Sequence, residues 1–444
     1  MMIDDELQVL GKPRKMSKRE KWRIAIASIV LLVLIVFLGI KLHKALALQE
    51  PETITPKKEI GEPTIVPELQ ESVDSLLNEK LMEIDGLQGQ VIVMEVQTGE
   101  ILAMVGRERK FDGTFQPCNN FAYQQELGSL AKTASLLAAL ETGKAKLHDV
   151  VDTGNGIWPV GNGLIMKDHN WLRGGYGAVT LDRAMEVSSN IGISKTVWKI
   201  FKGHEQDFFN ILDSMSYGQP DNIEGIDGLR PTRYDSPKHS DWANEYILWS
   251  SIGYNRKIAP IQMLTFYNAI ANDGVMVKPT LKVKEVEVIN PQIASKANIA
   301  SMKVVLDHVV TQGLGRRAGT PIFRVAGKTG TSQVKEYYYG DNEDPVCEYQ
   351  VAFCGYFPAD APKYSMIVSL NKLALPASGG GMAGVLFHDI TEWMITHGMP
   401  HVLVVDEEKN DTILITEDNI RSIMESLDSR DDGYNIHLGL EPLH

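Results

Sequence analysis

The chain has 444 residues, 43% of them hydrophobic and 23% charged, which is typical of a globular protein with two or three structural units and excludes a disordered, collagen-like or coiled-coil chain. The formal net charge of −13 argues against a protein that binds nucleic acid through a basic face. Three cysteines are too few for a disulfide scaffold and form no CxxC or Cys/His cluster, so we expect no metal site, and nothing in the chain calls for a cofactor. Cys347 and Cys354 could pair, although nothing in the sequence requires it.

The first element in chain order is an uncharged apolar run of 17 residues at 24–40. That length is at the short end of what spans a bilayer. Seven basic residues lie between positions 12 and 23, so the positive-inside rule predicts a cytoplasmic tail at 1–23, one transmembrane helix at 24–40 and an extracytoplasmic remainder. We therefore expect a single-pass protein of the plasma (inner) membrane. The alternative is a cleaved signal peptide ending near residues 45–47, which the length of the run disfavours.

The exported part has β-prone runs at both ends of a helix-rich middle. After a proline-rich linker over 41–65, the pattern predicts a helix over 67–86, strands over 90–96 and 100–105, a Gly- and helix-rich stretch over 115–320, strands over 324–334, 349–357 and 364–371, and a helix over 387–397. The simplest closure is one antiparallel sheet with terminal helices packed on it and a helical subdomain inserted between its strands. We expect this α/β domain over 66–400, followed by an acidic extension over 401–444.

The first chemical motif is Ser129-Leu130-Ala131-Lys132, at the start of an apolar helix that stops at Gly143. A spacing of three places the Ser hydroxyl and the Lys amine side by side on one helix face. A serine becomes a good nucleophile when a neighbouring base takes its proton, and a lysine serves as that base when burial lowers its pKa. Alone, this motif is weak evidence for a nucleophile, because the same Ser-to-Lys spacing recurs at Ser332. The simpler interpretation is that Ser129 caps the helix and Lys132 is a solvated charge.

The second and third motifs are Ser188-Ser189-Asn190, after a predicted helix over 181–187, and Lys328-Thr329-Gly330-Thr331 on a predicted strand. Ser188 could relay a proton and Asn190 could bind an amide, although a polar turn is the common alternative. Alternation puts Lys328 and Gly330 on one strand face, which suits an extended substrate whose carboxylate lies near the lysine. The alternative is a lysine that protects an edge strand. In this order, the three motifs together are typical of penicillin-binding proteins and serine β-lactamases.

The chain resembles the transpeptidase domain of class B penicillin-binding proteins over about residues 66–398. Beyond the three motifs, the similarity is carried by segments that look like the family's first hairpin, its nucleophile helix, the run into its second motif, a long helical stretch and its last hairpin, at 89–105, 126–144, 175–192, 250–279 and 353–368. The resemblance implies the penicillin-binding/serine β-lactamase-like fold and a membrane-anchored D,D-transpeptidase that cross-links peptidoglycan.

The resemblance also implies roles for the motif residues. Ser129 would attack the D-Ala-D-Ala carbonyl to form an acyl-enzyme, with Lys132 as general base. Ser188 would pass the proton to the departing D-Ala, and Asn190 would hold the donor's amide.

The strand Lys328-Thr329-Gly330-Thr331 would bind the substrate, with Lys328 and Thr331 on its terminal carboxylate. Alternation directs the Thr331 side chain away from Lys328, so that contact requires strand twist. The backbone N–H groups of Ser129 and Thr331 would form the oxyanion hole.

The implied partners are peptidoglycan stem peptides, with a D-Ala-D-Ala donor and an amine acceptor, and β-lactams as covalent inhibitors. A multi-pass lipid-II glycosyltransferase is the expected membrane partner of segment 24–40. The sequence departs from the usual organisation of the family, because residues 41–65 are too few for the pedestal domain that usually separates anchor and catalytic domain.

Two other functions compete with transpeptidation. A serine β-lactamase or D,D-carboxypeptidase would use the same acyl-serine, but no E-x-x-L-N pattern that would supply a water-activating glutamate follows Ser129. A non-enzymatic β-lactam sensor or a scaffold of the division or elongation machinery is the third hypothesis. The intact motif residues argue against an inactive scaffold, and the short cytoplasmic tail argues against a sensor.

Overall fold

The computed structural model describes residues 59–161, 163–232, 243–337 and 345–399, and the backbone of two short strands further on. The chain divides into two units, 1–58 and 59–444, and the first lies outside the described residues. The predicted cytoplasmic tail, transmembrane helix and most of the linker fall in that unit. Within the described ranges, no helix has both the length and the apolar character needed to cross a membrane.

Strands from both ends of the domain form one antiparallel sheet, as the sequence predicts. Its spatial order is β10 (Ala326–Tyr337), β11 (Val346–Phe357), β12 (Tyr364–Leu373), β1 (Gly86–Glu95), β2 (Ile101–Arg109) and β3 (Phe115–Pro117). The strands from the two ends of the domain meet where β1 pairs with β12, for example at Val91 and Val368. This pairing leaves β10 at one edge of the sheet.

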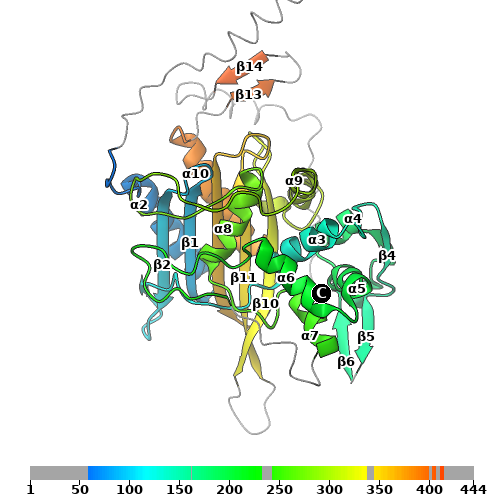
Figure 1. Cartoon of the computed structure of the whole chain (residues 1–444). Coiled ribbons are helices and arrows are strands. Elements are labelled where there is room, and N and C mark those ends of the chain that lie inside the picture. The colour runs from blue at the N-terminus through cyan, green and yellow to red at the C-terminus, as the bar shows by residue number, and fades with distance from the viewer. Residues whose placement is uncertain are drawn as a thin grey trace, which may run out of the picture. The chain divides into compact units, whose positions relative to one another are not determined.

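The two faces of the sheet bury separate cores because successive side chains of a strand point to opposite sides. In β1, Val91 and Val93 join the core under the terminal helices α2 (Pro67–Glu83) and α10 (Gly384–Thr396). Ile92 and Met94 join the opposite core, which contains α8 (Pro260–Ala271), a helix that is buried on every side. Figure 1 shows the sheet between these layers.

Most of the part inserted between β3 and β10 lies beside the β10 edge, while α8 packs on the face of the sheet against β11 and β12 (Figure 1). Besides α8, its helical segments are a 3-10 turn η1 (Gly128–Ala131), α3 (Lys132–Glu141), η2 (Trp171–Arg173), α4 (Leu181–Glu186), α5 (Asn190–Phe201), α6 (Glu205–Ser214), α7 (Ala243–Ser250), α9 (Lys296–Thr311) and η3 (Arg316–Ala318). It also contains three small strand pairs that the sequence analysis did not predict: β4 (Val150–Asp152) with β7 (Ala178–Thr180), β5 (Ile157–Gly161) with β6 (Leu164–Lys167), and β8 (Met276–Val277) with β9 (Val288–Asn290). These strands are too short to show a clear alternation between their Gly-rich turns.

The suggested pairing of Cys347 with Cys354 is wrong, because both thiols are free. Both residues lie on β11. Seven positions along a strand correspond to about 23 Å, and an odd spacing directs the side chains to opposite faces. Within the predicted acidic extension, the structure describes the backbone of an antiparallel pair formed by β13 (Leu403–Asp406) and β14 (Asp411–Leu414).

Candidate active site

The turn 128–131 that carries Ser129, the predicted nucleophile, is called the nucleophile turn, and it rests directly on the backbone of the edge strand β10. Ser129 lies in η1, one turn before α3, and is half-buried. Gly128 has φ +53°, and a Cβ at this position would lie 2.5 Å from the Thr331 carbonyl oxygen. Only glycine tolerates both the dihedral and the contact. Ser129 does not cap α3, whose N-cap is Ala131, so the capping alternative for this serine is wrong.

Lys132 is completely buried, so it is not the solvated helix charge of the alternative interpretation. It opens α3, a central helix whose residues are buried from Lys132 through Leu140. Its Nζ donates to the Ser188 carbonyl oxygen at 2.6 Å, to Asn190 Oδ1 at 2.7 Å and to Ser188 Oγ at 3.2 Å. The first and second motifs are therefore joined by one amine.

The second motif is both a polar turn and a helix start. Ser188 has φ +53°, an uncommon value for a residue with a side chain. Ser189 is the N-cap of α5, and its Oγ accepts from the Gly192 N–H. Asn190 Oδ1 accepts from Lys132, while its Nδ2 donates to the Lys167 carbonyl oxygen at 2.7 Å. The cap orients the neighbouring Ser188 and Asn190 side chains toward the lysine.

Lys328 is also completely buried, which rules out the alternative of an exposed charge guarding the edge strand. Its Nζ donates to Ser188 Oγ at 2.9 Å and to the Thr329 carbonyl oxygen at 3.1 Å. Ser188 Oγ thus accepts from the lysines of both other motifs.

Burial lowers the pKa of both lysines, because removal from water disfavours the charged amine. The pKa of Lys132 falls to about 7, although the charge of Asp168 acts in the opposite direction. The pKa of Lys328 is lowered well below its usual value, first by burial and then by the charge of Lys132. A lysine with a pKa near neutrality is able to take a proton from a serine hydroxyl.

The remaining residues of the third motif face different neighbours. Gly330 lies against the nucleophile turn, since a Cβ there would be 2.7 Å from the Leu127 carbonyl oxygen. Thr329 is nearly buried, with its Oγ1 3.4 Å from Lys328 Nζ. The exposed Thr331 accepts through Oγ1 from the Gly379 N–H at 3.2 Å, in the π-helical turn η4 (Gly379–Ala383) that leads into α10.

The backbone of Thr331 points toward the nucleophile turn. Its carbonyl oxygen faces Gly128, and in an antiparallel strand the N–H and C=O of one residue point to the same side. The Thr331 N–H therefore leaves the β10 edge in the direction of Ser129, which is the arrangement that the predicted oxyanion hole needs.

The domain model described as the penicillin-binding protein transpeptidase domain matches residues 89–392. The chain belongs to this family. It is 28% identical over 342 residues to penicillin-binding protein PbpB of Mycolicibacterium smegmatis, covering 70% of this chain and 50% of the relative. It is 23% identical over 326 residues to peptidoglycan D,D-transpeptidase FtsI of Escherichia coli, covering 67% of this chain and 51% of the relative. The chain thus spans about half the length of these curated relatives.

Solved structures support the fold of this penicillin-binding transpeptidase domain. The apo TP domain of Burkholderia pseudomallei penicillin-binding protein 3 superposes with a TM-score of 0.63 at 24% identity, covering 79% of this chain and 99% of that one. The predicted penicillin-binding fold with its antiparallel sheet is thereby confirmed.

Two groups in this transpeptidase domain were missed by motif reasoning. Asp168 is completely buried and bonded to the second motif. Next to it, His169 forms a hydrogen bond between its Nε2 and the Tyr176 hydroxyl at 2.9 Å. Burial and the charge of Lys132 lower the pKa of His169. Neither residue stands in a recognisable pattern, because both lie in a loop that approaches the motifs only in the folded chain.

Proposed function

We propose that this protein is a membrane-anchored peptidoglycan D,D-transpeptidase that works through an acyl-serine intermediate. One observation carries the proposal: Ser188 Oγ accepts hydrogen bonds from both Lys132 and Lys328, so residues from three distant segments form one polar cluster around Lys132, which stands three positions after Ser129 in the first motif. The match to the penicillin-binding transpeptidase family supports the same chemistry.

In the proposed first step, Lys132 takes the proton of the Ser129 hydroxyl, and Ser129 Oγ attacks the carbonyl carbon of the penultimate D-Ala. The N–H groups of Ser129 and Thr331 stabilise the developing oxyanion. The C–N bond to the terminal D-Ala then breaks, and the leaving amine receives the proton from Lys132 through Ser188.

In the second step, the amine of a neighbouring stem peptide attacks the ester. The attacking amine gives a proton to Lys132, the C–O bond to Ser129 breaks as the new amide forms, and Lys132 passes that proton to Ser129 Oγ. Asn190 holds the donor's amide and Lys328 its carboxylate, which fixes the carbonyl near Ser129.

Labelling with a fluorescent penicillin tests the acyl-serine. Membranes with the wild-type chain should label, and those with Ser129→Ala should not. Ser75→Ala is the matched control, because Ser75 is an exposed serine of α2, on the far side of the sheet. Labelling of Ser129→Ala at the wild-type level would refute the proposed nucleophile.

The lifetime of the penicilloyl adduct separates a transpeptidase from a β-lactamase. The bound ring remnant of penicillin blocks the amine, so only water remains, and a missing general base slows hydrolysis about 10²–10⁴-fold. Intact-protein mass spectrometry should show stoichiometric labelling long after free drug is removed. Clearance within seconds with repeated nitrocefin turnover would instead support the β-lactamase alternative.

The anchor and orientation are part of the proposal, and the seven basic residues before position 24 motivate them. Protease added to intact spheroplasts should remove the catalytic domain and leave residues 1–23 protected. A catalytic domain that stays protected would overturn this orientation.

We also propose that segment 24–40 docks on a multi-pass lipid-II glycosyltransferase. Ala25, Ala27, Ser28 and Gly39 are small enough for close helix approach. Replacing 24–40 by an unrelated membrane helix should abolish co-purification and complementation while penicillin labelling remains. Full complementation by the swapped chain would refute the docking.

A further inference from the structure

Asp168 makes two buried hydrogen bonds to the second motif. It follows β6 directly and is 0% exposed. Its Oδ2 accepts from Ser189 Oγ at 2.7 Å, and its Oδ1 accepts from the Ile191 N–H at 3.1 Å. The carboxylate therefore spans the first turn of α5, where free backbone N–H groups favour a negative charge.

A second link lies beside the first. Asn190 Nδ2 donates to the carbonyl oxygen of Lys167, the residue before Asp168. Lys167 and Asp168 thus hold the side chains of Ser189 and Asn190, and Asn190 in turn accepts from Lys132.

We propose that Asp168 is a positioning residue for acyl transfer: it fixes the segment 188–191 against the β5–β6 hairpin and places a buried negative charge within reach of Lys132. The proposal deepens the proposed function, on which it rests. Asp168 acts through other groups and not on the substrate.

The hydrogen bonds of Asp168 explain how Ser188 keeps its uncommon backbone conformation. On one side, the carbonyl oxygen of Glu186 accepts from the Leu314 N–H at 3.1 Å. On the other side, Ser189 is bonded to Asp168. Since Glu186 and Ser189, on either side of Ser188, are both held by hydrogen bonds, the surrounding structure imposes the positive φ of Ser188.

The negative charge of Asp168 acts on the protonation of Lys132. In the described part of the chain, the titratable groups that interact with this amine are Asp168, Lys328 and His169. Burial lowers the pKa of Lys132, and Asp168 raises it. Without the carboxylate, burial acts unopposed, so the pKa of Lys132 falls further and its free base persists at lower pH.

The test is the pH profile of acylation by a fluorescent penicillin, measured on the full chain with Asp168→Asn. The amide retains an acceptor for Ile191 and removes the charge. We expect the midpoint of the acidic limb to fall by about half a unit or more, with a lower plateau rate. Asp273→Asn, in an exposed ion pair with Lys303, is the matched control and should keep the wild-type profile.

Ser189→Ala separates charge from geometry, because it removes the hydroxyl donor and leaves the carboxylate. It should lower the plateau rate and leave the midpoint in place. An unchanged or raised midpoint in Asp168→Asn would overturn the proposal. If Asp168→Asn does not fold, Asp168→Glu should fold and acylate with an acidic midpoint near that of the wild type. If neither variant folds, Asp168 serves only the stability of the domain, and the proposal is overturned. A wild-type chain that acylates at no pH would instead refute the proposed function.

Discussion

Lys328 Nζ lies 2.9 Å from Ser188 Oγ, although the two residues are 140 positions apart in the chain. Lys328 comes from the edge strand of the sheet and Ser188 from the turn between α4 and α5. The active-site groups are therefore brought together by the way the inserted subdomain packs on the β10 edge, and substitutions on either side of that contact test the arrangement.

Replacing Lys328 by alanine should slow acylation by β-lactams roughly ten- to a hundredfold, because a charge-assisted hydrogen bond to a carboxylate is worth about 1.5–3 kcal/mol. The fold should persist. The second-order rate of labelling measures the effect, and Lys335→Ala is the control because Lys335 is exposed on the same strand. A methyl-ester penicillin, which lacks the carboxylate, should react equally with wild type and Lys328→Ala. Unchanged acylation of the acid form would remove Lys328 from substrate binding.

Acylation should depend on pH through Lys132, whose pKa is about 7. Because the base must be neutral, the rate should be level above this pH and fall about tenfold per unit below it. Stopped-flow labelling between pH 5 and 9 measures the profile. A rate that keeps rising up to pH 10 would mean that Lys132 retains an ordinary lysine pKa and that burial does not tune it.

Gly128→Ala should disrupt the nucleophile turn. The added Cβ would lie 2.5 Å from the Thr331 carbonyl oxygen, a backbone atom that is held in the sheet, so Ser129 must move. A shift of about 1 Å at the reacting atom can cost about a hundredfold in rate. Gly143→Ala is the matched control, with φ +68° and no atom within 4 Å of the added group. A labelling rate in Gly128→Ala as high as that of Gly143→Ala would show that the turn accommodates the added Cβ without displacing Ser129.

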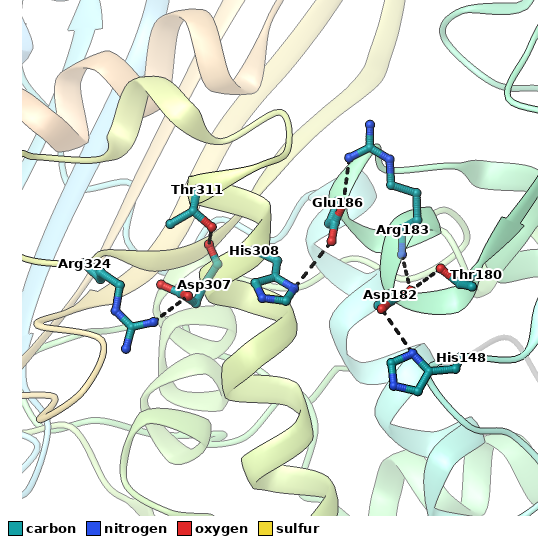
Figure 2. A network of polar contacts seen from close by, with 9 residues as sticks. All are labelled: His148, Thr180, Asp182, Arg183, Glu186, Asp307, His308, Thr311 and Arg324. Carbon is teal, nitrogen blue, oxygen red and sulfur yellow. Dashed lines mark hydrogen bonds and ion pairs between the residues drawn. The ribbon is translucent and has the colours of Figure 1, made fainter. Parts of the chain in front are cut away.

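Glu186 ties the segment before Ser188 to α9, as Figure 2 shows. Its buried carboxylate accepts from Arg183 Nη1 at 2.7 Å and lies 3.5 Å from His308 Nδ1. Glu186→Ala should lower the free energy of unfolding by about 1–3 kcal/mol, because the buried contacts are lost, and should also slow acylation. Urea denaturation and penicillin labelling measure the two effects.

The control for Glu186 is Glu71→Ala, an exposed acidic residue of α2, which is a different helix from those around the second motif. It should change neither quantity. Normal acylation in a destabilised Glu186→Ala protein would show that the α4–α9 contact supports the fold without positioning Ser188.

The sequence was sufficient where the pattern is local. The short, nearly continuous apolar runs at 90–96 and 349–357 identify strands because a strand that is buried on both faces carries apolar residues at successive positions, and both ends of the domain must pair to bury these faces. Likewise, Ser129 and Lys132 are neighbours on any helix with a spacing of three. The sheet could therefore be predicted, and so could the pairing of the proposed nucleophile with the proposed base.

Only the tertiary structure decided which charged side chains are removed from water and which polar groups lie next to them. The motifs single out Lys132 and Lys328 but do not show that the two side chains are buried, and their complete burial is seen only in the folded domain, where the inserted subdomain packs on β10. For the same reason Asp168 could not be found from a motif, since its partners Ser189 and Ile191 lie more than twenty positions away. Desolvation and charge pairing depend on distances in space, so the protonation of the site is a property of the packed chain and not of its motifs.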